Sequence, residues 1–201
     1  TLGKRKRAKA GRVTIDDCDR HGQGCGRQFM FNHMRLMKAI GVQTLEAYLS
    51  QDNGAYTWSK MGYKIAAQTN WKDIHSDIHK RLRILSGYIG EDAVQTFIDR
   101  FEAMEPEDPY MFYKIAHWDT SLDEALGDDK HSLILEANIF RDAEFYLMQR
   151  TMTVGQYLLC SLSVDGCFDL NDNEQLKRLE RYCGRCFETG EFLPCQTPQI
   201  K

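Results

Sequence analysis

Several features are missing from this chain of 201 residues, and each absence argues against one class of protein. No apolar run approaches the ~18 residues that a membrane-spanning helix needs, so we expect no membrane span. No internal repeat, low-complexity segment or secretory signal sequence is recognisable either. The net charge is only -3, which argues against a protein that coats nucleic acid non-specifically. What remains is an ordinary globular composition, with 42% apolar and 27% charged residues.

The seven cysteines are odd in number and scattered along the chain. This usage is typical of a reducing compartment, so we expect a cytoplasmic protein. Cys183 and Cys186 form one Cys-x-x-Cys pair, and Cys195 follows nearby. A structural zinc site commonly takes two close pairs. We therefore favour reduced, metal-free thiols over a zinc site.

The most informative stretch runs from residue 12 to residue 63. Alternation over 12–16 predicts a strand, and apolar spacing up to Ile40 predicts a helix that Gly41 ends. A second alternating segment, 42–49, predicts another strand, and a short helix follows before Gly62. The order is strand, glycine loop, helix, strand, helix.

Three glycines at alternate positions, Gly22, Gly24 and Gly26, stand where the predicted helix begins. Without side chains, this backbone can approach a bulky anion closely. The start of a helix adds unpaired N–H groups and a positive dipole end. The loop is therefore a candidate pyrophosphate-binding site. A flexible turn is the plainer interpretation of the glycine run by itself.

The flanks of the loop resemble the second half of the GNAT N-acetyltransferase superfamily. Two segments carry the resemblance: His21-Gly22-Gln23-Gly24-Cys25-Gly26, similar to the acyl-CoA pyrophosphate loop, and Lys60-Met61-Gly62-Tyr63, similar to the family's Lys-x-Gly-Phe ending. The variant over 54–63 resembles most closely the degenerate GNAT-like domains of large phage-encoded proteins. The resemblance covers about fifty residues of the 201.

The resemblance implies an α/β (α+β) fold: a partial GNAT-like mixed sheet with flanking helices, followed by a mainly helical extension. Residues 1–70 would form the acyl-CoA-binding core, and residues 71–201 the extension. Only Thr1–Gly11 precede the first predicted strand, which leaves no room for the family's first elements. We therefore expect the chain to be a fragment of a longer protein.

The resemblance also assigns site residues. The binding of acetyl-CoA falls to His21, Gly22, Gln23, Gly24, Cys25, Gly26 and Arg27. The family's acid, a tyrosine four residues before the final glycine, is replaced by Trp58, whose indole N–H is no usable acid. Tyr56, Tyr63 or water would have to protonate the leaving thiolate.

The candidate bases are Asp16 and Asp17, with His21 a weaker option. Turn chemistry is the plainer role for these two aspartates, because aspartate side chains bond to the backbone of turns. We expect no metal at this site.

Two functions stay open. The first is acyl-CoA-dependent N-acyl transfer to an amine, with activity unproven. The second is a non-catalytic structural or interaction domain of a viral (phage virion) or multidomain protein, in contact with other chains and located in the host cytoplasm or the virion. Nucleic-acid binding is a minor third option, through the basic run Lys4–Lys9 alone, which is more simply a solvated edge strand or tail.

The rest of the chain predicts helices. Apolar spacing favours two helices over 71–104, broken at Gly87 and Gly90, one from Ser132 toward Met148, and a charged amphipathic one over 174–182. His75 and His79 lie four apart, and a chance pair on a solvated face is the favoured interpretation over a metal pair. Asp169 and Asp172 precede the last helix, where capping is their simplest role.

Overall fold

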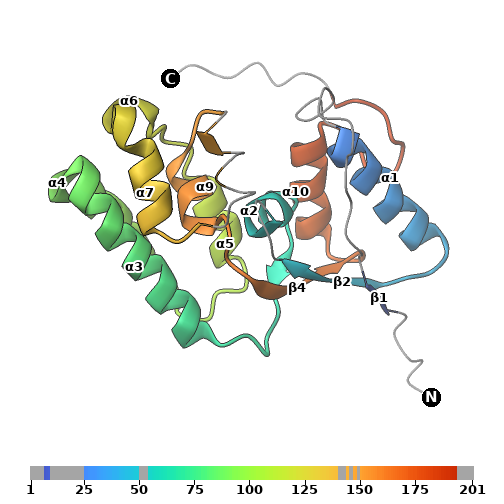
Figure 1. Ribbon diagram of the computed structural model, residues 1–201. Helices are drawn as coiled ribbons and strands as arrows, with labels where there is room; N and C mark the ends of the chain where they lie inside the picture. Colours follow the sequence, from blue (N-terminus) through green and yellow to red (C-terminus); the bar gives the residue numbers. More distant parts are fainter. Residues whose placement is uncertain are drawn as a thin grey trace. The chain divides into compact units, whose positions relative to one another are not determined.

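The computed structural model describes residues 7–9, 25–49, 54–139, 144, 147, 148 and 150–193. Strands and helices alternate in the first part of the chain, and helices dominate the middle (Figure 1). The predicted strand at 12–16 lies outside the described residues, as do Lys4, Arg5 and Lys6 of the basic run.

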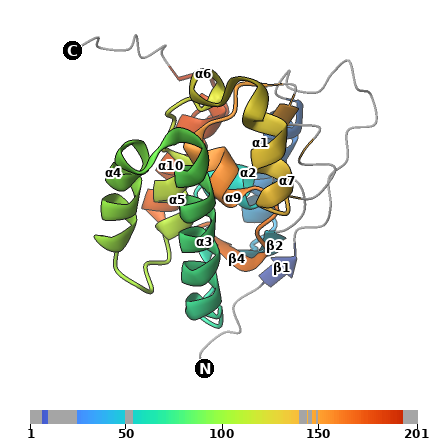
Figure 2. The same cartoon turned by 60° about the vertical axis from the view of Figure 1, so that its left-hand side comes forward.

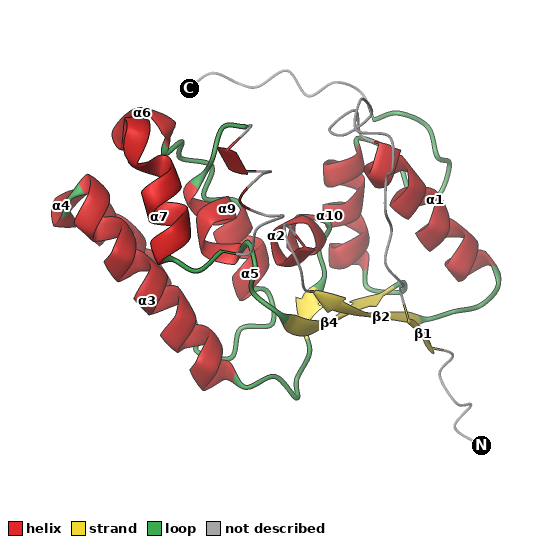
Figure 3. Cartoon of the chain, in the orientation of Figure 1, coloured by secondary structure: helices red, strands yellow, loops and turns green. Residues whose placement is uncertain are grey.

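Four strands form one mixed sheet in the order β1-β2-β4-β3 (Figure 3). Their bounds are β1 Arg7–Lys9, β2 Thr44–Leu49, β3 Lys64–Ile65 and β4 Val164–Asp169. The two edges are β1 and β3, and β1 pairs parallel to β2 with Ala8 opposite Leu45. Helices flank the sheet, so the predicted α+β class is confirmed.

The predicted second strand is present as β2, with the expected alternation of burial. Leu45, Ala47 and Leu49 are buried, whereas Glu46 is half-buried and Tyr48 is exposed. This period of two places the apolar side chains on one face of the sheet. The basic residue Arg7 lies on the edge strand β1, where its guanidinium pairs with Glu46 at 3.1 Å.

The sequence did not predict strand β4, because Asp165-Gly166 has the composition of a turn. Gly166 is instead a site of close approach within the sheet. A Cβ built on Gly166 would lie 2.6 Å from the Leu49 side chain. Glycine at this position therefore leaves room for a buried leucine of β2.

The chain divides into two compact units, residues 1–47 with 167–201 and residues 48–166. The first unit is discontinuous in sequence. These units are defined by compactness and not by ligand binding. The predicted division after residue 70, into an acyl-CoA-binding core and a helical extension, therefore stays a prediction.

In the described part of the first unit, helices α1 (Cys25–Ala39) and α10 (Asn173–Cys183) pack on each other. Helix α1 buries Met30, Phe31 and Met34. Helix α10 begins where predicted, because the Asp172 carboxylate accepts hydrogen bonds from the backbone N–H groups of residues 174 and 175 at 2.9 and 3.2 Å. This confirms the predicted capping role of Asp172.

Helices make up most of the part of the second unit that the structure describes. Its helices are α2 Gly54–Lys60, α3 Trp71–Ile89, α4 Glu91–Glu102, α5 Met111–Ala116, α6 Asp123–Leu126, the 3-10 turn η2 Gly127–Asp129, α7 Lys130–Glu136 and α9 Val154–Leu159. Helices α3 and α4 lie side by side in both views (Figures 1 and 2).

The two helices predicted over 71–104 are present, with one correction. Helix α3 continues through Gly87 and ends at Gly90, whose φ of 92° suits glycine. The expectation of a solvated histidine pair also needs correction. His75 and His79 are half-buried, and their rings lie 5.1 and 5.0 Å from the Phe101 ring of α4. Both histidines therefore help to pack α3 against α4.

The helix predicted from Ser132 toward Met148 is too long. Helix α7 ends at Glu136, and Asn138 has a positive φ of 52° that an α-helix does not allow. The segment before α7 holds α6 and η2. Residues 140–143, 145, 146 and 149 lie outside the described residues.

Candidate functional site

The predicted acyl-CoA loop leads directly into α1. The helix begins at Cys25, so Cys25, Gly26 and Arg27 form its first turn, which holds no acidic residue. His21, Gly22, Gln23 and Gly24 lie outside the described residues. Helix α1 connects two parallel neighbouring strands, β1 and β2. The described residues thus form a β–α–β unit, and Gly22 and Gly24 precede its helix in the sequence.

Arg27 is the one predicted cofactor residue whose side chain is described. It is exposed, and its guanidinium carbon lies 4.6 Å from the centroid of the Tyr182 ring of α10. This is cation–π geometry, which leaves the guanidinium N–H groups available to a further acceptor. Arg27 was predicted from the sequence, but its contact with Tyr182 was not, because the two residues are 155 positions apart in the chain.

Tyr63, a predicted candidate acid, is a core residue of the second unit. Its side chain is 1% exposed, and its ring packs edge-to-face on Trp58 with the centroids 4.9 Å apart. A proton donor must come within hydrogen-bond reach of the reacting group. The burial of Tyr63 therefore favours the half-buried Tyr56 as the candidate acid.

Tyr56 lies one helical turn before Lys60 on α2. The Lys60 ammonium is 5.1 Å from the centre of the Tyr56 ring and 2.8 Å from an oxygen of Asp119. Burial lowers the pKa of Lys60, but hydrogen bonds to Asp119 and Tyr56 outweigh it, so the pKa is raised overall. Lys60 therefore stays charged beside the Tyr56 ring.

Asp16 and Asp17, the predicted bases, lie outside the described residues. Their assignment stays a prediction, as does the turn chemistry that competes with it. The described cofactor-loop residues belong to the first unit, whereas Tyr56 and Tyr63 belong to the second.

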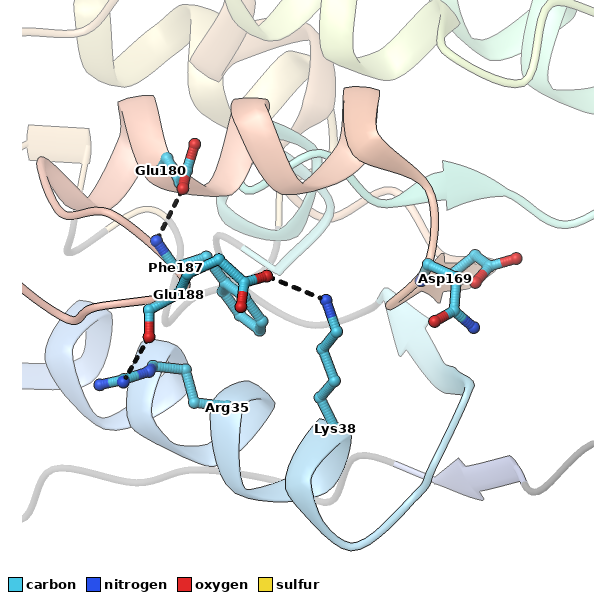
Figure 4. Close-up of polar contacts among 7 residues, drawn as sticks. Arg35, Lys38, Asp169, Glu180, Phe187 and Glu188 are labelled. Carbon is cyan, nitrogen blue, oxygen red and sulfur yellow. Dashed lines mark hydrogen bonds and ion pairs between the residues drawn. The ribbon is translucent and has the colours of Figure 1, made fainter.

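A C-terminal turn, residues 184–193, holds α1 against α10 in the first unit (Figure 4). Arg185 and Phe192 form an antiparallel bridge that closes the turn. Buried Phe187 packs edge-to-face on Phe31 of α1, and its N–H donates to the Glu180 carboxylate at 2.7 Å. One side of the turn thus docks on each helix.

Two cations of α1 complete the docking of this turn. Arg35 donates to the backbone oxygen of Glu188 at 3.0 Å, and Lys38 pairs with the Glu188 carboxylate at 3.3 Å (Figure 4). The Arg35 guanidinium also covers Gly190, where a Cβ would lie 2.2 Å from a guanidinium nitrogen. The sequence did not predict this docking, although Gly190 was a local signal for a turn.

The described residues contain no group of three or more His, Cys, Asp or Glu side chains suited to a metal ion. Cys183 is half-buried, with its sulfur 3.9 Å from the Arg27 backbone oxygen. Burial raises the pKa of this thiol to about 12, although the guanidiniums of Arg27 and Arg185 act in the opposite direction. Cys195 lies outside the described residues.

A comparison with protein-family models found no match, and comparisons with curated proteins and with solved structures found none either. Among the helices that the structure describes, none is both long and apolar enough to cross a membrane.

Proposed function

We propose that the chain is an acyl-CoA-binding, GNAT-like domain that transfers an acetyl group from acetyl-CoA to an amine. The observation that carries this proposal is the β1–α1–β2 unit: parallel neighbouring strands joined by a helix that begins directly after Gly24. A glycine-rich loop at the start of such a helix is a recurring way to bind pyrophosphate.

The electrostatics of α1 support an anion at its start. No acidic residue lies in its first turn, and Arg27 is exposed there. The unpaired N–H groups of the first turn add donors, and the helix dipole favours negative charge. In this proposal the pyrophosphate of acetyl-CoA binds at residues 22–27.

The transfer step needs an amine, a base and an acid. The amine attacks the thioester carbonyl, its proton passes to a base, and the departing thiolate takes a proton from an acid. Tyr56 is our candidate acid, because it is half-buried whereas Tyr63 is 1% exposed. Asp16 and Asp17 remain the candidate bases.

The second candidate is a non-catalytic structural or interaction domain of a viral or multidomain protein, in the virion or the host cytoplasm. Trp58 favours it, because an indole stands where the resemblance places the acid. Retaining a fold does not require retaining its chemistry.

A thermal-shift measurement with acetyl-CoA tests the proposal. At a ligand concentration ~100 times the Kd, binding stabilises the protein by about 2.7 kcal/mol, which raises Tm by roughly 5–10 °C for a chain of this size. Gly24→Val should abolish the shift by filling the loop, whereas Gly87→Ala, on α3, should keep it. Absence of a shift in the unaltered protein would contradict acyl-CoA binding.

A further inference from the structure

Two arginine side chains of the first unit are stacked on aromatic rings. The Arg27 guanidinium carbon lies 4.6 Å from the centroid of the Tyr182 ring, and that of Arg185 lies 3.8 Å from the centroid of the Phe192 ring. Phe192 is 74% exposed, so the second of these pairs lies at the protein surface. An aromatic ring contacts the face of a guanidinium and leaves the N–H donors at its edge for an acceptor.

The two guanidiniums lie near one sulfur atom. The Cys183 sulfur is 3.9 Å from the Arg27 backbone oxygen. Both guanidiniums act to lower the pKa of this thiol, against the larger effect of burial. Because a Coulombic interaction weakens with distance, both positive charges lie close to Cys183. The first turn of α1 and the C-terminal turn, which are far apart in the sequence, thus bring two cations to one place.

Neither guanidinium pairs with a carboxylate among the residues that the structure describes. One N–H of Arg185 donates to the Gly190 backbone oxygen at 3.1 Å. The carboxylates of Glu180 and Glu188, which flank Arg185 in the sequence, bind a backbone N–H and Lys38 instead. The positive charge of the arginine pair is therefore not balanced by these acidic residues, which suits an anion with several oxygens.

Charge and geometry favour a phosphate monoester as this anion. Such a group carries a charge of about -1.5 to -2 at pH 7, and its three oxygens can accept paired N–H donors from two guanidiniums. The pyrophosphate of the proposed site needs neither side chain, because backbone N–H groups of residues 22–27 bind it. The Arg27 side chain lies over Tyr182 of α10 instead. Coenzyme A carries a phosphate monoester on its ribose, the 3′-phosphate, in addition to its pyrophosphate.

We propose that the side chains of Arg27 and Arg185 bind the 3′-phosphate of coenzyme A. This inference rests on the proposed function, because it requires the pyrophosphate to lie at the start of α1. Arg185 lies outside the segment that resembles the acetyltransferases. The C-terminal turn then supplies one residue of the cofactor site, besides holding α1 against α10.

Isothermal titration calorimetry with coenzyme A and with dephospho-coenzyme A, which lacks only this phosphate, tests the inference. We expect coenzyme A to bind at least about tenfold more tightly, because its charge-assisted hydrogen bonds to the arginines are lost with the phosphate. Equal affinities would overturn the inference and leave the proposed function standing. Absence of binding by both ligands would overturn the proposed function as well.

Three variants test which arginines are responsible. Arg185→Gln should weaken the binding of coenzyme A about tenfold and leave that of dephospho-coenzyme A unchanged, and Arg27→Gln should do the same. Arg181→Gln is the matched control. Arg181 is exposed on α10 and its Nε donates to a backbone oxygen at 3.4 Å, so this variant should keep the preference for coenzyme A. A preference that survives Arg185→Gln, or an equal loss of both ligands in that variant, would contradict a role of Arg185 at this phosphate.

Discussion

At the scale of single residues, a buried arginine of the second unit binds the end of α9. Arg81 is 7% exposed, and its guanidinium donates to the backbone oxygens of Tyr157, Leu158 and Cys160 at the end of α9. Tyr157 returns a hydrogen bond to the Arg81 backbone oxygen at 3.0 Å. Burial lowers the pKa of Arg81, although Tyr157, Cys160 and Asp77 act in the opposite direction.

Arg81→Met should therefore destabilise the protein far more than its conservative volume suggests. The substitution leaves three buried carbonyl groups without their donor, at a cost of about 3 kcal/mol in the free energy of unfolding. Arg83→Met, two residues along the same helix at an exposed position, should change it by less than about 0.5 kcal/mol. Urea denaturation measures both. Equal effects would contradict the capping role of Arg81.

From the raised pKa of Cys183 we predict how the alkylation rate of this thiol depends on pH. Because alkylation requires the thiolate, a thiol with a pKa of about 12 reacts slowly near pH 8. Its alkylation rate should keep rising about tenfold per pH unit up to pH 10, whereas the rate of an ordinary thiol levels off near its pKa of ~8.5. Peptide mapping after timed alkylation measures this. A plateau for Cys183 below pH 9 would contradict burial of the thiol.

At the scale of elements, the sequence predicted those helices and strands whose apolar residues follow a regular local spacing. The alternation of β2, the apolar spacing of α3 and α4, and the Asp172 cap of α10 are all local patterns, and the structure contains them. Strand β4 was not predicted, because its pairing partners are distant in sequence. Gly166 leaves room for the Leu49 side chain and does not form a turn. Of the predicted site, the structure describes the helix start, Arg27, Tyr56 and Tyr63. The burial of Tyr63 depends on packing that the sequence does not show.

The two kinds of helical glycine give a matched test of packing between elements. A Cβ on Gly155 of α9 would lie 2.4 Å from the backbone oxygen of Ile115 in α5, whereas a Cβ on Gly87 of α3 meets nothing within 4 Å. Gly155→Ala should destabilise the protein by at least ~2 kcal/mol through overpacking. Gly87→Ala should stabilise it by up to ~1 kcal/mol through helix propensity. Thermal unfolding distinguishes them, and the same sign for both variants would refute the predicted packing contrast.

At the scale of the whole molecule, the first unit is built from both ends of the chain. Residues before 48 and after 166 meet there, and the C-terminal turn docks on α1 through Phe187, Arg35 and Lys38. Contacts of such long sequence separation leave no local signature, which is why the sequence did not predict the docking of this turn. The same contacts brace the helix on which the proposed acyl-CoA site depends.

The measurement that tests the central claim most directly is a titration of the ¹⁵N-labelled protein with acetyl-CoA, followed by NMR. Binding at the start of α1 predicts the largest amide shifts at Gly26 and Arg27, because their N–H groups would face the pyrophosphate. Amides in the middle of α3, such as that of Ile78, should not move. Unchanged amides at Gly26 and Arg27 with millimolar acetyl-CoA, or shifts confined to other elements, would contradict the account.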